Sequence, residues 1–198
     1  MIFKQLRQNM DVKDAVFNKI YPPCIQAAAE RHWTPVAVAK LAAEYLAEKP
    51  GKKVLDIGAG AGKFCLVGAA STNGFFYGVE QRASLTKISR KIAEKHDITN
   101  VEFINSNINK INFSNYEAFY FFNSFFENID TSSPIDHTIL PDSYLYHTYS
   151  DYVKEQLYKT PVGTRLVTYW SKWDEIPGNF ELVDSACNGF LSFWEKAS

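Results

Sequence analysis

The segment KKVLDIGAGAGKF, residues 52–64, decides the fold of this chain. Residues 54–57 form a short and mostly apolar run, which is typical of a strand buried on both faces of a parallel sheet. Glycine then occupies every second position, at Gly58, Gly60 and Gly62. Because glycine has no Cβ, such a backbone can approach a ligand closely, and that contact can offset the entropy that glycine loses on folding. The segment therefore predicts a strand that ends in a ligand-binding loop.

The rest of the chain alternates between patterns of strands and helices. We expect strands at 54–57, 74–80, 101–105, 118–122, 164–170, 180–183 and 189–194, and helices at 62–70, 83–95 and 144–159. This alternation is typical of βαβ units and a parallel sheet, in which ligands sit at the carboxyl ends of the strands. The predicted fold is a Rossmann-like three-layer α/β/α sandwich with a mostly parallel seven-stranded sheet and an antiparallel C-terminal strand.

The 198 residues are enough for one domain with a full core, and we expect a single domain over 1–198. Within it, residues 1–50 form an N-terminal helical cap and residues 51–198 form the ligand-binding α/β core. The clearest helical pattern of the cap follows Thr34 and Pro35. Thr34 is predicted to be the N-cap of that helix, because threonine and a following proline suit its first turn.

Composition narrows the possible functions. Lys and Arg total 21 against 22 Asp and Glu, so the net charge of −1 does not favour long nucleic acids as partners. The three cysteines, Cys24, Cys65 and Cys187, are far apart and form no CxxC or Cys/His cluster, which argues against a metal site and against disulfides. No run approaches the roughly 20 apolar residues of a membrane span. We therefore expect a cytoplasmic protein with no metal and no membrane association.

Two classes of ligand compete for the glycine loop. The dinucleotide pattern of NAD(P)-dependent oxidoreductases is GxGxxG, whereas this loop has GxGxG. Asp56 stands two positions before the first glycine, where a carboxylate would repel a pyrophosphate but would attract an amino group. The loop therefore favours a ligand with an amino or positively charged group.

Residues 54–62, VLDIGAGAG, resemble motif I of the class I S-adenosylmethionine (SAM)-dependent methyltransferases, and the resemblance extends over roughly residues 35–195. It implies that SAM is the cofactor and that its methionine part and ribose lie against Asp56, Gly58, Ala59, Gly60 and Gly62. It also implies that Glu80, at the end of the second strand, accepts both ribose hydroxyls, with Gln81 beside it in the cofactor site. No metal is required.

Two further cofactor contacts are implied by the resemblance. Asn107 stands after the third strand, where the family often binds the adenine amino group with Asp, and an Asx-turn is the alternative role for this asparagine. Thr34 lies in the segment HWTP, residues 32–35, which resembles an aromatic-Thr-Pro segment that lines the SAM pocket in several branches of the family. Helix capping is the alternative role for Thr34.

The fourth strand is followed by Asn123-Ser124-Phe125-Phe126, which resembles motif IV of the amino methyltransferases. In that motif, Asp/Asn-Pro-Pro-Tyr/Phe, the first residue accepts a hydrogen bond from the target nitrogen and the aromatic ring stacks on a planar substrate. Asn123, Phe125 and Phe126 are therefore candidate catalytic residues. Both prolines are missing here, and aromatic core packing is the alternative role for the phenylalanines.

The expected function is SAM-dependent methyl transfer to a small molecule or a protein side chain, with N-methylation suggested by the motif. A nucleic-acid methyltransferase of the adenine-N6 type and a non-catalytic SAM-binding module are the alternatives. The loop 127–143 is expected to select the substrate. Glu127, Asp130, His137 and His147 are possible bases, and the sequence does not choose among them.

Overall fold

The computed structural model describes residues 1–125, 128, 139, 142–171 and 173–198. Its sheet has seven strands in the order β3-β2-β1-β4-β5-β7-β6. The strands are β1 (Lys53–Ile57), β2 (Phe75–Glu80), β3 (Val101–Asn105), β4 (Ala118–Phe121), β5 (Arg165–Tyr169), β6 (Phe180–Ala186) and β7 (Leu191–Lys196). The first five pair in parallel, and β7 runs antiparallel to both β5 and β6. The predicted fold is therefore confirmed.

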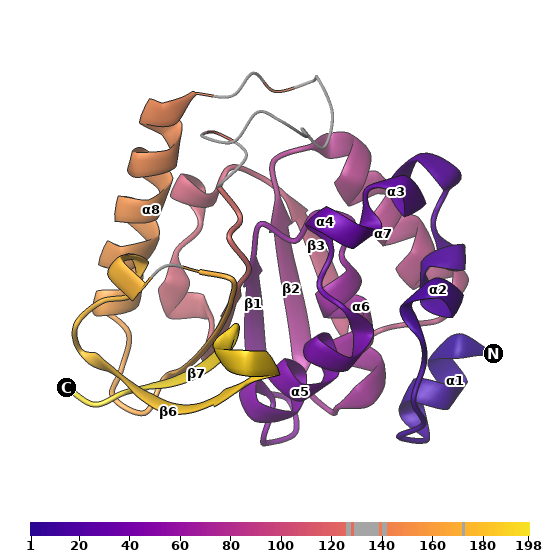
Figure 1. Ribbon diagram of the computed structural model, residues 1–198, viewed down its shortest axis with the longest axis horizontal. Helices are drawn as coiled ribbons and strands as arrows, with labels where there is room; N and C mark the ends of the chain where they lie inside the picture. The colour runs from indigo at the N-terminus through magenta and orange to yellow at the C-terminus, as the bar shows by residue number, and fades with distance from the viewer. Residues whose placement is uncertain (126–127, 129–138, 140–141, 172) are drawn as a thin grey trace.

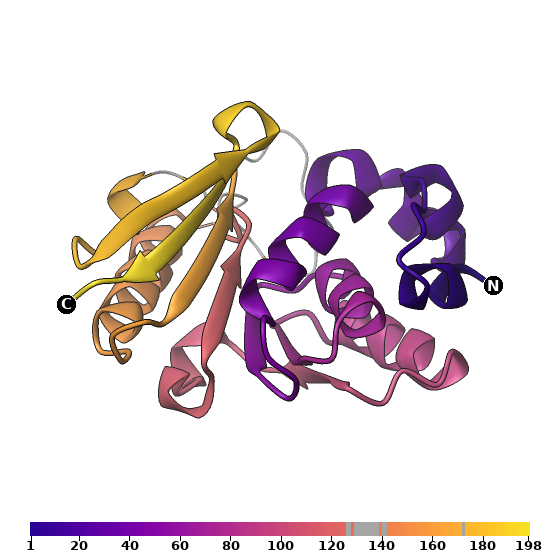
Figure 2. The same cartoon turned by 90° about the horizontal axis from the view of Figure 1, so that it is seen from below.

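Helices cover both faces of the sheet. The chain begins with α1 (Ile2–Arg7), α2 (Asp14–Phe17), η1 (Asn18–Ile20), α3 (Pro23–Ala27) and α4 (Ala29–His32), followed by α5 (Val36–Leu46), α6 (Lys63–Ser71) and α7 (Ala83–Lys95). Later in the chain come α8 (Ser143–Tyr158) and the short turns η2 (Ile108–Lys110), η3 (Phe113–Asn115), η5 (Trp173–Glu175) and η6 (Cys187–Gly189). Figure 1 and Figure 2 show α5, α6 and the N-terminal helices on one side of the sheet and α8 on the other.

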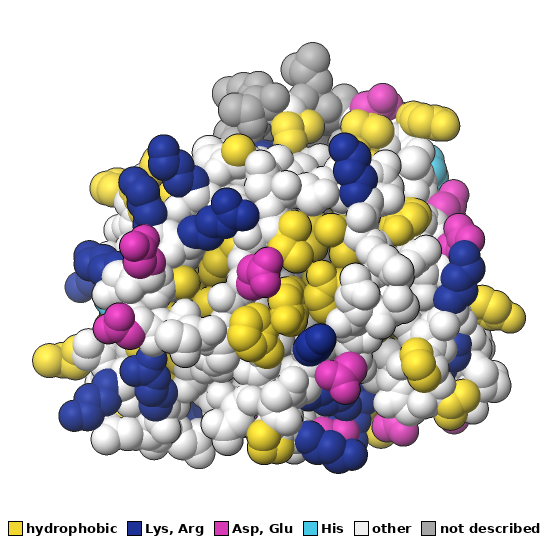
Figure 3. Space-filling view, turned by 180° about the vertical axis from the view of Figure 1, so that it is seen from behind, with side chains coloured by type: hydrophobic (Ala, Val, Ile, Leu, Met, Phe, Trp, Pro, Cys, Tyr) yellow, Lys and Arg dark blue, Asp and Glu magenta, His cyan; other side chains and the backbone are white. Residues whose placement is uncertain are grey.

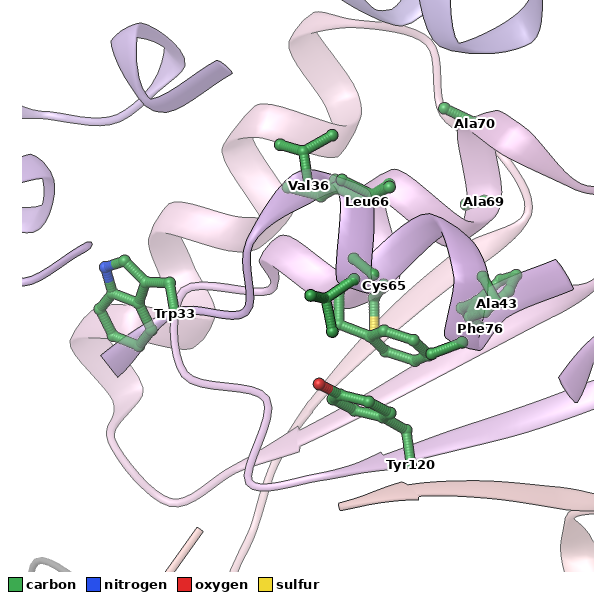
Figure 4. Close-up of a cluster of buried hydrophobic side chains, with 14 of the residues drawn as sticks. Trp33, Val36, Ala43, Cys65, Leu66, Ala69, Ala70, Phe76 and Tyr120 are labelled. Carbon is green, nitrogen blue, oxygen red and sulfur yellow. The ribbon is translucent and has the colours of Figure 1, made fainter. Parts of the chain in front are cut away.

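The larger core lies between the sheet and the layer of α5 and α6. Figure 4 shows side chains of α5 and α6 gathered with Phe76 of β2 above Tyr120 of β4. Tyr120 is 1% exposed, and its ring stacks on Phe64 with centroids 3.8 Å apart. This packing fixes α6, and with it the glycine loop that precedes α6, against the middle of the sheet.

On the opposite face of the sheet, α8 packs over β4 and β5. Only the short turns η2 and η3 lie between β3 and β4, so no long helix follows β3. Tyr77, Ile104 and Tyr116 are consequently only partly buried. Figure 3, which looks at the molecule from behind, shows hydrophobic side chains exposed near the centre of this face.

Three local predictions differ from the structure, one of them the last strand, which was expected at 189–194 and runs over Leu191–Lys196. Thr34 is not the N-cap, because α5 begins at Val36 with Pro35 before it, and the Val36 N–H donates to Asp14 Oδ1 at 3.1 Å instead. The Thr34 hydroxyl is hydrogen-bonded to the Tyr120 hydroxyl at 2.8 Å. It therefore pairs with a buried group of the sheet and does not cap the helix. The sixth strand is longer than expected and runs to Ala186, because a bulge between Leu182 and Asp184 restores its pairing with β7. No helix among the described residues is long and apolar enough to cross a membrane.

Candidate cofactor-binding site

A cavity of about 690 Å³ opens at the carboxyl ends of the first five strands. Parallel α/β sheets bind ligands at this edge, because the loops that follow their strands converge there. The wall contains ten of the residues predicted from the sequence: Thr34, Asp56, Gly58, Ala59, Gly60, Glu80, Gln81, Asn107, Asn123 and Phe125. The fold thus brings residues from distant parts of the chain to one site.

The glycine loop has the backbone conformation that favours glycine. Gly58 and Gly60 adopt φ angles of +78° and +54°, in the left-handed region. A Cβ at Gly58 would overlap Ser124, and one at Gly60 would overlap the ring of Trp33. The loop is therefore packed tightly between β4 and the N-terminal segment while its backbone lines the cavity.

Gly62 has a different place from the other two glycines. It precedes α6 with φ +77°, and a Cβ there would lie 2.5 Å from the ring of Phe103. Gly62 does not line the cavity. Its position supports the close packing of α6 on β3 and places the start of that helix beside the loop.

Glu80 ties the glycine loop to the end of β2. The side chain is 7% exposed, and its Oε2 accepts the Gly60 N–H at 3.0 Å. Its Oε1 accepts the Arg82 N–H at 2.7 Å and lies 3.8 Å from the Arg82 guanidinium. Both carboxylate oxygens can accept hydrogen bonds, and Glu80 lines the cavity. The ribose contact of Glu80 and the role of Gln81 beside it stay predictions.

Asp56 is a buried carboxyl group on the cavity wall. Its pKa is raised from 3.8 to about 7, mainly by burial and to a smaller extent by the charge of Glu80, while a thiol hydrogen bond from Cys65 at 3.4 Å works in the opposite direction. At neutral pH this carboxyl is poised between its neutral and ionised forms. A cationic amino group in the cavity would favour the ionised form.

Asn107 forms the Asx-turn that was the alternative to a direct adenine contact. Its Oδ1 accepts the Asn109 N–H at 3.2 Å, and its Nδ2 donates to the Tyr149 hydroxyl at 2.5 Å. The side chain still lines the cavity. The structure therefore fixes its orientation from both ends of the amide, and the adenine contact stays a prediction.

The candidate catalytic residues lie past the end of β4. Asn123 has a left-handed backbone with φ 41°, and its N–H donates to Ser171 Oγ at 3.4 Å. Phe125 is 6% exposed and packs between the rings of Phe121 and Tyr149, at centroid distances of 5.6 Å and 5.4 Å. Phe125 therefore packs in the hydrophobic core and also lines the cavity.

Several other candidates do not enter the described site. Phe126, Glu127, Asp130 and His137 lie outside the residues that the structure describes, as does most of the predicted substrate loop. His147 is exposed on α8 and does not line the cavity. Within the described ranges, no group of three or more His, Cys, Asp or Glu side chains could hold a metal ion.

The wall also contains residues that the sequence patterns did not single out. Lys63, only 3% exposed, forms an ion pair with Asp14 of α2, and burial lowers its pKa. Tyr149 comes from α8, and Trp170 directly follows β5. The strand-end rule would have indicated Trp170, but nothing local marks Lys63 or Tyr149 as cavity residues.

Comparison with known proteins agrees with this architecture. A family model described as a methyltransferase domain matches residues 48–158, more than half of the chain. A methyltransferase from Geobacter sulfurreducens is similar over 100% of this chain and 96% of its own, at 12% identity and a TM-score of 0.63. No curated protein sequence matches the chain.

Two other solved structures share the fold. An RNA methyltransferase from Salinibacter ruber, in complex with S-adenosyl-L-homocysteine, is similar over 82% of this chain and 91% of its own, at 18% identity and a TM-score of 0.57. TrmN from Thermus thermophilus is 18% identical with a TM-score of 0.60, over 85% of this chain, which spans about half (51%) of TrmN. At such identities these likenesses show the fold alone, while the family match shows membership: the chain belongs to the methyltransferase domain family, the class I Rossmann-like methyltransferases whose cofactor is SAM.

Proposed function

We propose that this methyltransferase transfers the methyl group of SAM to a nitrogen atom of a small molecule or a protein side chain. The observation that carries the proposal is the position of Asn123, which sits past β4 in a left-handed conformation on the wall of the cavity that the glycine loop lines. The oxygen of its amide can accept a hydrogen bond from an N–H of the acceptor. That hydrogen bond would aim the nitrogen lone pair at the methyl group.

The described residues fit the polar groups of SAM. The poised carboxyl of Asp56 suits its amino group, the Glu80 carboxylate on the cavity wall suits the ribose hydroxyls, and the backbone of Gly58, Ala59 and Gly60 allows close approach. SAM itself supplies an electrophilic methyl group on a sulfonium. The contribution of the chain is to hold the acceptor nitrogen in line with that methyl group, and such positioning can supply about 7–11 kcal/mol in favourable cases.

A nucleic-acid base is the second candidate acceptor. Two of the similar structures are named as an RNA methyltransferase and an rRNA methylase, which supports this reading at the level of the fold. The net charge of −1 favours an acceptor without a long phosphate backbone. A non-catalytic SAM-binding module would explain the missing prolines of motif IV, and it predicts SAM binding without turnover.

The test compares SAM binding with turnover. Calorimetry measures the affinity for SAM, and formation of S-adenosylhomocysteine with a cell extract measures transfer. For Asn123→Ala we expect unchanged SAM affinity and a rate at least 100-fold lower, and for Asn123→Asp, which keeps an acceptor oxygen, a smaller loss. Ser171→Ala is the matched control, because it removes the contacts of the Ser171 hydroxyl with the backbone of Asn123, Phe121 and Tyr169 but keeps the Asn123 amide. Full turnover by Asn123→Ala would refute the proposed role.

A further inference from the structure

Two aromatic rings form a stacked pair at the rim of the cavity. The rings of Trp170 and Phe190 are nearly parallel, with centroids 3.7 Å apart and an interplanar angle of 15°. A hydrogen bond from the Trp170 N–H to the Phe190 carbonyl, at 3.0 Å, fixes the two backbones to each other. We call this pair the rim stack.

The backbone on both sides of the rim stack is held in an uncommon conformation. Trp170 has φ 53°, in the left-handed region that bulky residues rarely adopt. Cys187, Asn188 and Gly189, which lead into Phe190, have φ angles of 54°, 57° and 85°. Backbone strain of this kind gathers at ligand and active sites, where it persists because the surrounding structure imposes it.

The rim stack remains open to solvent although it is large and apolar. Trp170 is 51% exposed and Phe190 is 41% exposed. Trp170 also lines the cavity, and the ring of Tyr169 beside it packs on Phe122 with centroids 4.9 Å apart. Aromatic surface therefore continues from the rim to the wall near Asn123, and an exposed apolar patch next to a cavity is typical of a binding surface.

Charge divides the cavity into two halves. Among the described residues on its wall, the acidic and basic side chains Asp56, Lys63, Glu80 and Arg82 all belong to the end of β1, the start of α6 and the end of β2 with the residues that follow it. The described parts of β4, β5, α8 and the segments that follow these strands contribute only neutral side chains to the wall. A charged acceptor would find no described partner in this second half, whereas a neutral ring would find aromatic faces and the amide of Asn123.

We propose that the rim stack is a platform on which a neutral, planar heteroaromatic ring with an amino group stacks, so that the amino group reaches Asn123. This inference rests on the proposed N-methylation and names its class of acceptor. The ring can belong to a free nucleoside-like molecule or to a base of single-stranded RNA, because both present the same π-face and exocyclic amine. Stacking on an aromatic side chain tolerates differences among such rings, so selection falls to the amino group.

The test measures ring binding to the full chain loaded with S-adenosylhomocysteine. The probes are adenosine, cytidine, a ten-nucleotide single-stranded RNA of A and C, and n-butylamine. We expect the ring probes to bind and butylamine not to bind. Stacking contributes about 1–3 kcal/mol per base, which predicts a 5- to 150-fold larger dissociation constant for Trp170→Ala. Trp170→Phe keeps an aromatic stack, so we expect a smaller loss of affinity. Val183→Ala, an exposed apolar residue of β6 outside the cavity wall, should change nothing.

The outcomes separate this inference from the proposed function. Binding of the nucleosides alone identifies a free acceptor, and binding of the RNA only identifies a base in a strand, and the platform stands in both cases. The platform is refuted if no ring probe binds at millimolar concentration, if folded Trp170→Ala binds rings as tightly as the parent, or if butylamine binds as well as adenosine. N-methylation fails separately, if S-adenosylhomocysteine never forms or if the product carries its new methyl group on an atom other than nitrogen.

Discussion

The Gly60 N–H donates to Glu80 Oε2 at 3.0 Å, which joins the loop after β1 to the carboxylate at the end of β2. These two residues are 20 positions apart in the chain, and β1 and β2 are neighbours in the sheet. The proposed ribose partner therefore also shapes the loop that would hold the methionine part. Substitution of Glu80 should affect binding and loop stability together.

We expect Glu80→Ala to weaken SAM binding at least tenfold and to lower the melting temperature. The change removes hydrogen bonds to a charged acceptor, each worth about 1.5–3 kcal/mol, and leaves buried N–H groups without a partner. Calorimetry with SAM and thermal unfolding check both effects. Glu117→Ala is the matched control, because Glu117 also accepts a backbone N–H, that of Lys53 at 2.9 Å, but at the opposite end of β1. NAD binding in place of SAM would return the loop to the dinucleotide class.

Asp56 should make both stability and SAM affinity depend on pH. The folded chain keeps this proton up to a pKa of about 7, whereas the unfolded chain releases it near 3.8. Between these values the unfolded state binds fewer protons, so the free energy of unfolding falls as pH rises. Asp56→Asn should therefore gain stability over the parent protein as pH rises from 4 to 7, measured by urea unfolding at several pH values.

The same carboxyl should favour SAM at higher pH. Ionised Asp56 attracts a cationic amino group, so the affinity of the parent protein should rise between pH 6 and pH 8. In Asp56→Asn the affinity should be lower and this component of the pH dependence should be absent. Titration of the ligand itself is common to both proteins and cancels in the comparison. Parallel pH profiles for the two proteins would contradict an Asp56 contact.

Gly60→Ala should lower stability and SAM affinity more than Gly163→Ala, although both glycines have a left-handed backbone. A left-handed conformation costs an L-residue about 1–2 kcal/mol, and at Gly60 the new Cβ would also overlap the Trp33 ring. Gly163 has φ +80° and open space around its Cβ position, so Gly163→Ala isolates the strain alone. We expect similar SAM affinity for Gly163→Ala and the parent, and weaker SAM binding with a larger loss of stability for Gly60→Ala.

The ion pair between Lys63 and Asp14 should contribute to the stability of the folded chain. Asp14 also accepts the Val36 N–H at 3.1 Å, so Asp14→Ala removes the cap of α5 and leaves a buried ammonium without its carboxylate. We expect a loss of about 1–3 kcal/mol, since Asp14 itself is partly exposed. The double variant Asp14→Asn/Lys63→Met should recover part of it. Additive losses in urea unfolding would show that the two residues act independently.

The sequence by itself determined the order of the elements and the main chemistry of the loop. Strand and helix patterns are set by local periodicity, and β3 and α7 have the bounds that the patterns predicted. Gly58 and Gly60 were recognisable because a ligand loop after a buried strand demands residues without a Cβ. Glu80 was recognisable through the resemblance to the class I methyltransferases, which implies an acidic ribose partner at the end of the second strand. These inferences needed only local patterns and that resemblance, both of which are read along the chain.

Only the tertiary structure decided how the walls of the cavity meet. Thr34 contacts Tyr120, and Trp170 stacks on Phe190, because the sheet order places the ends of distant segments side by side. The raised pKa of Asp56 likewise follows from burial beneath the glycine loop and α6. No local pattern encodes these features, since each depends on which side chains exclude water from a given group. Propensity and spacing act along the chain, whereas pairing, desolvation and strain act across the folded sheet.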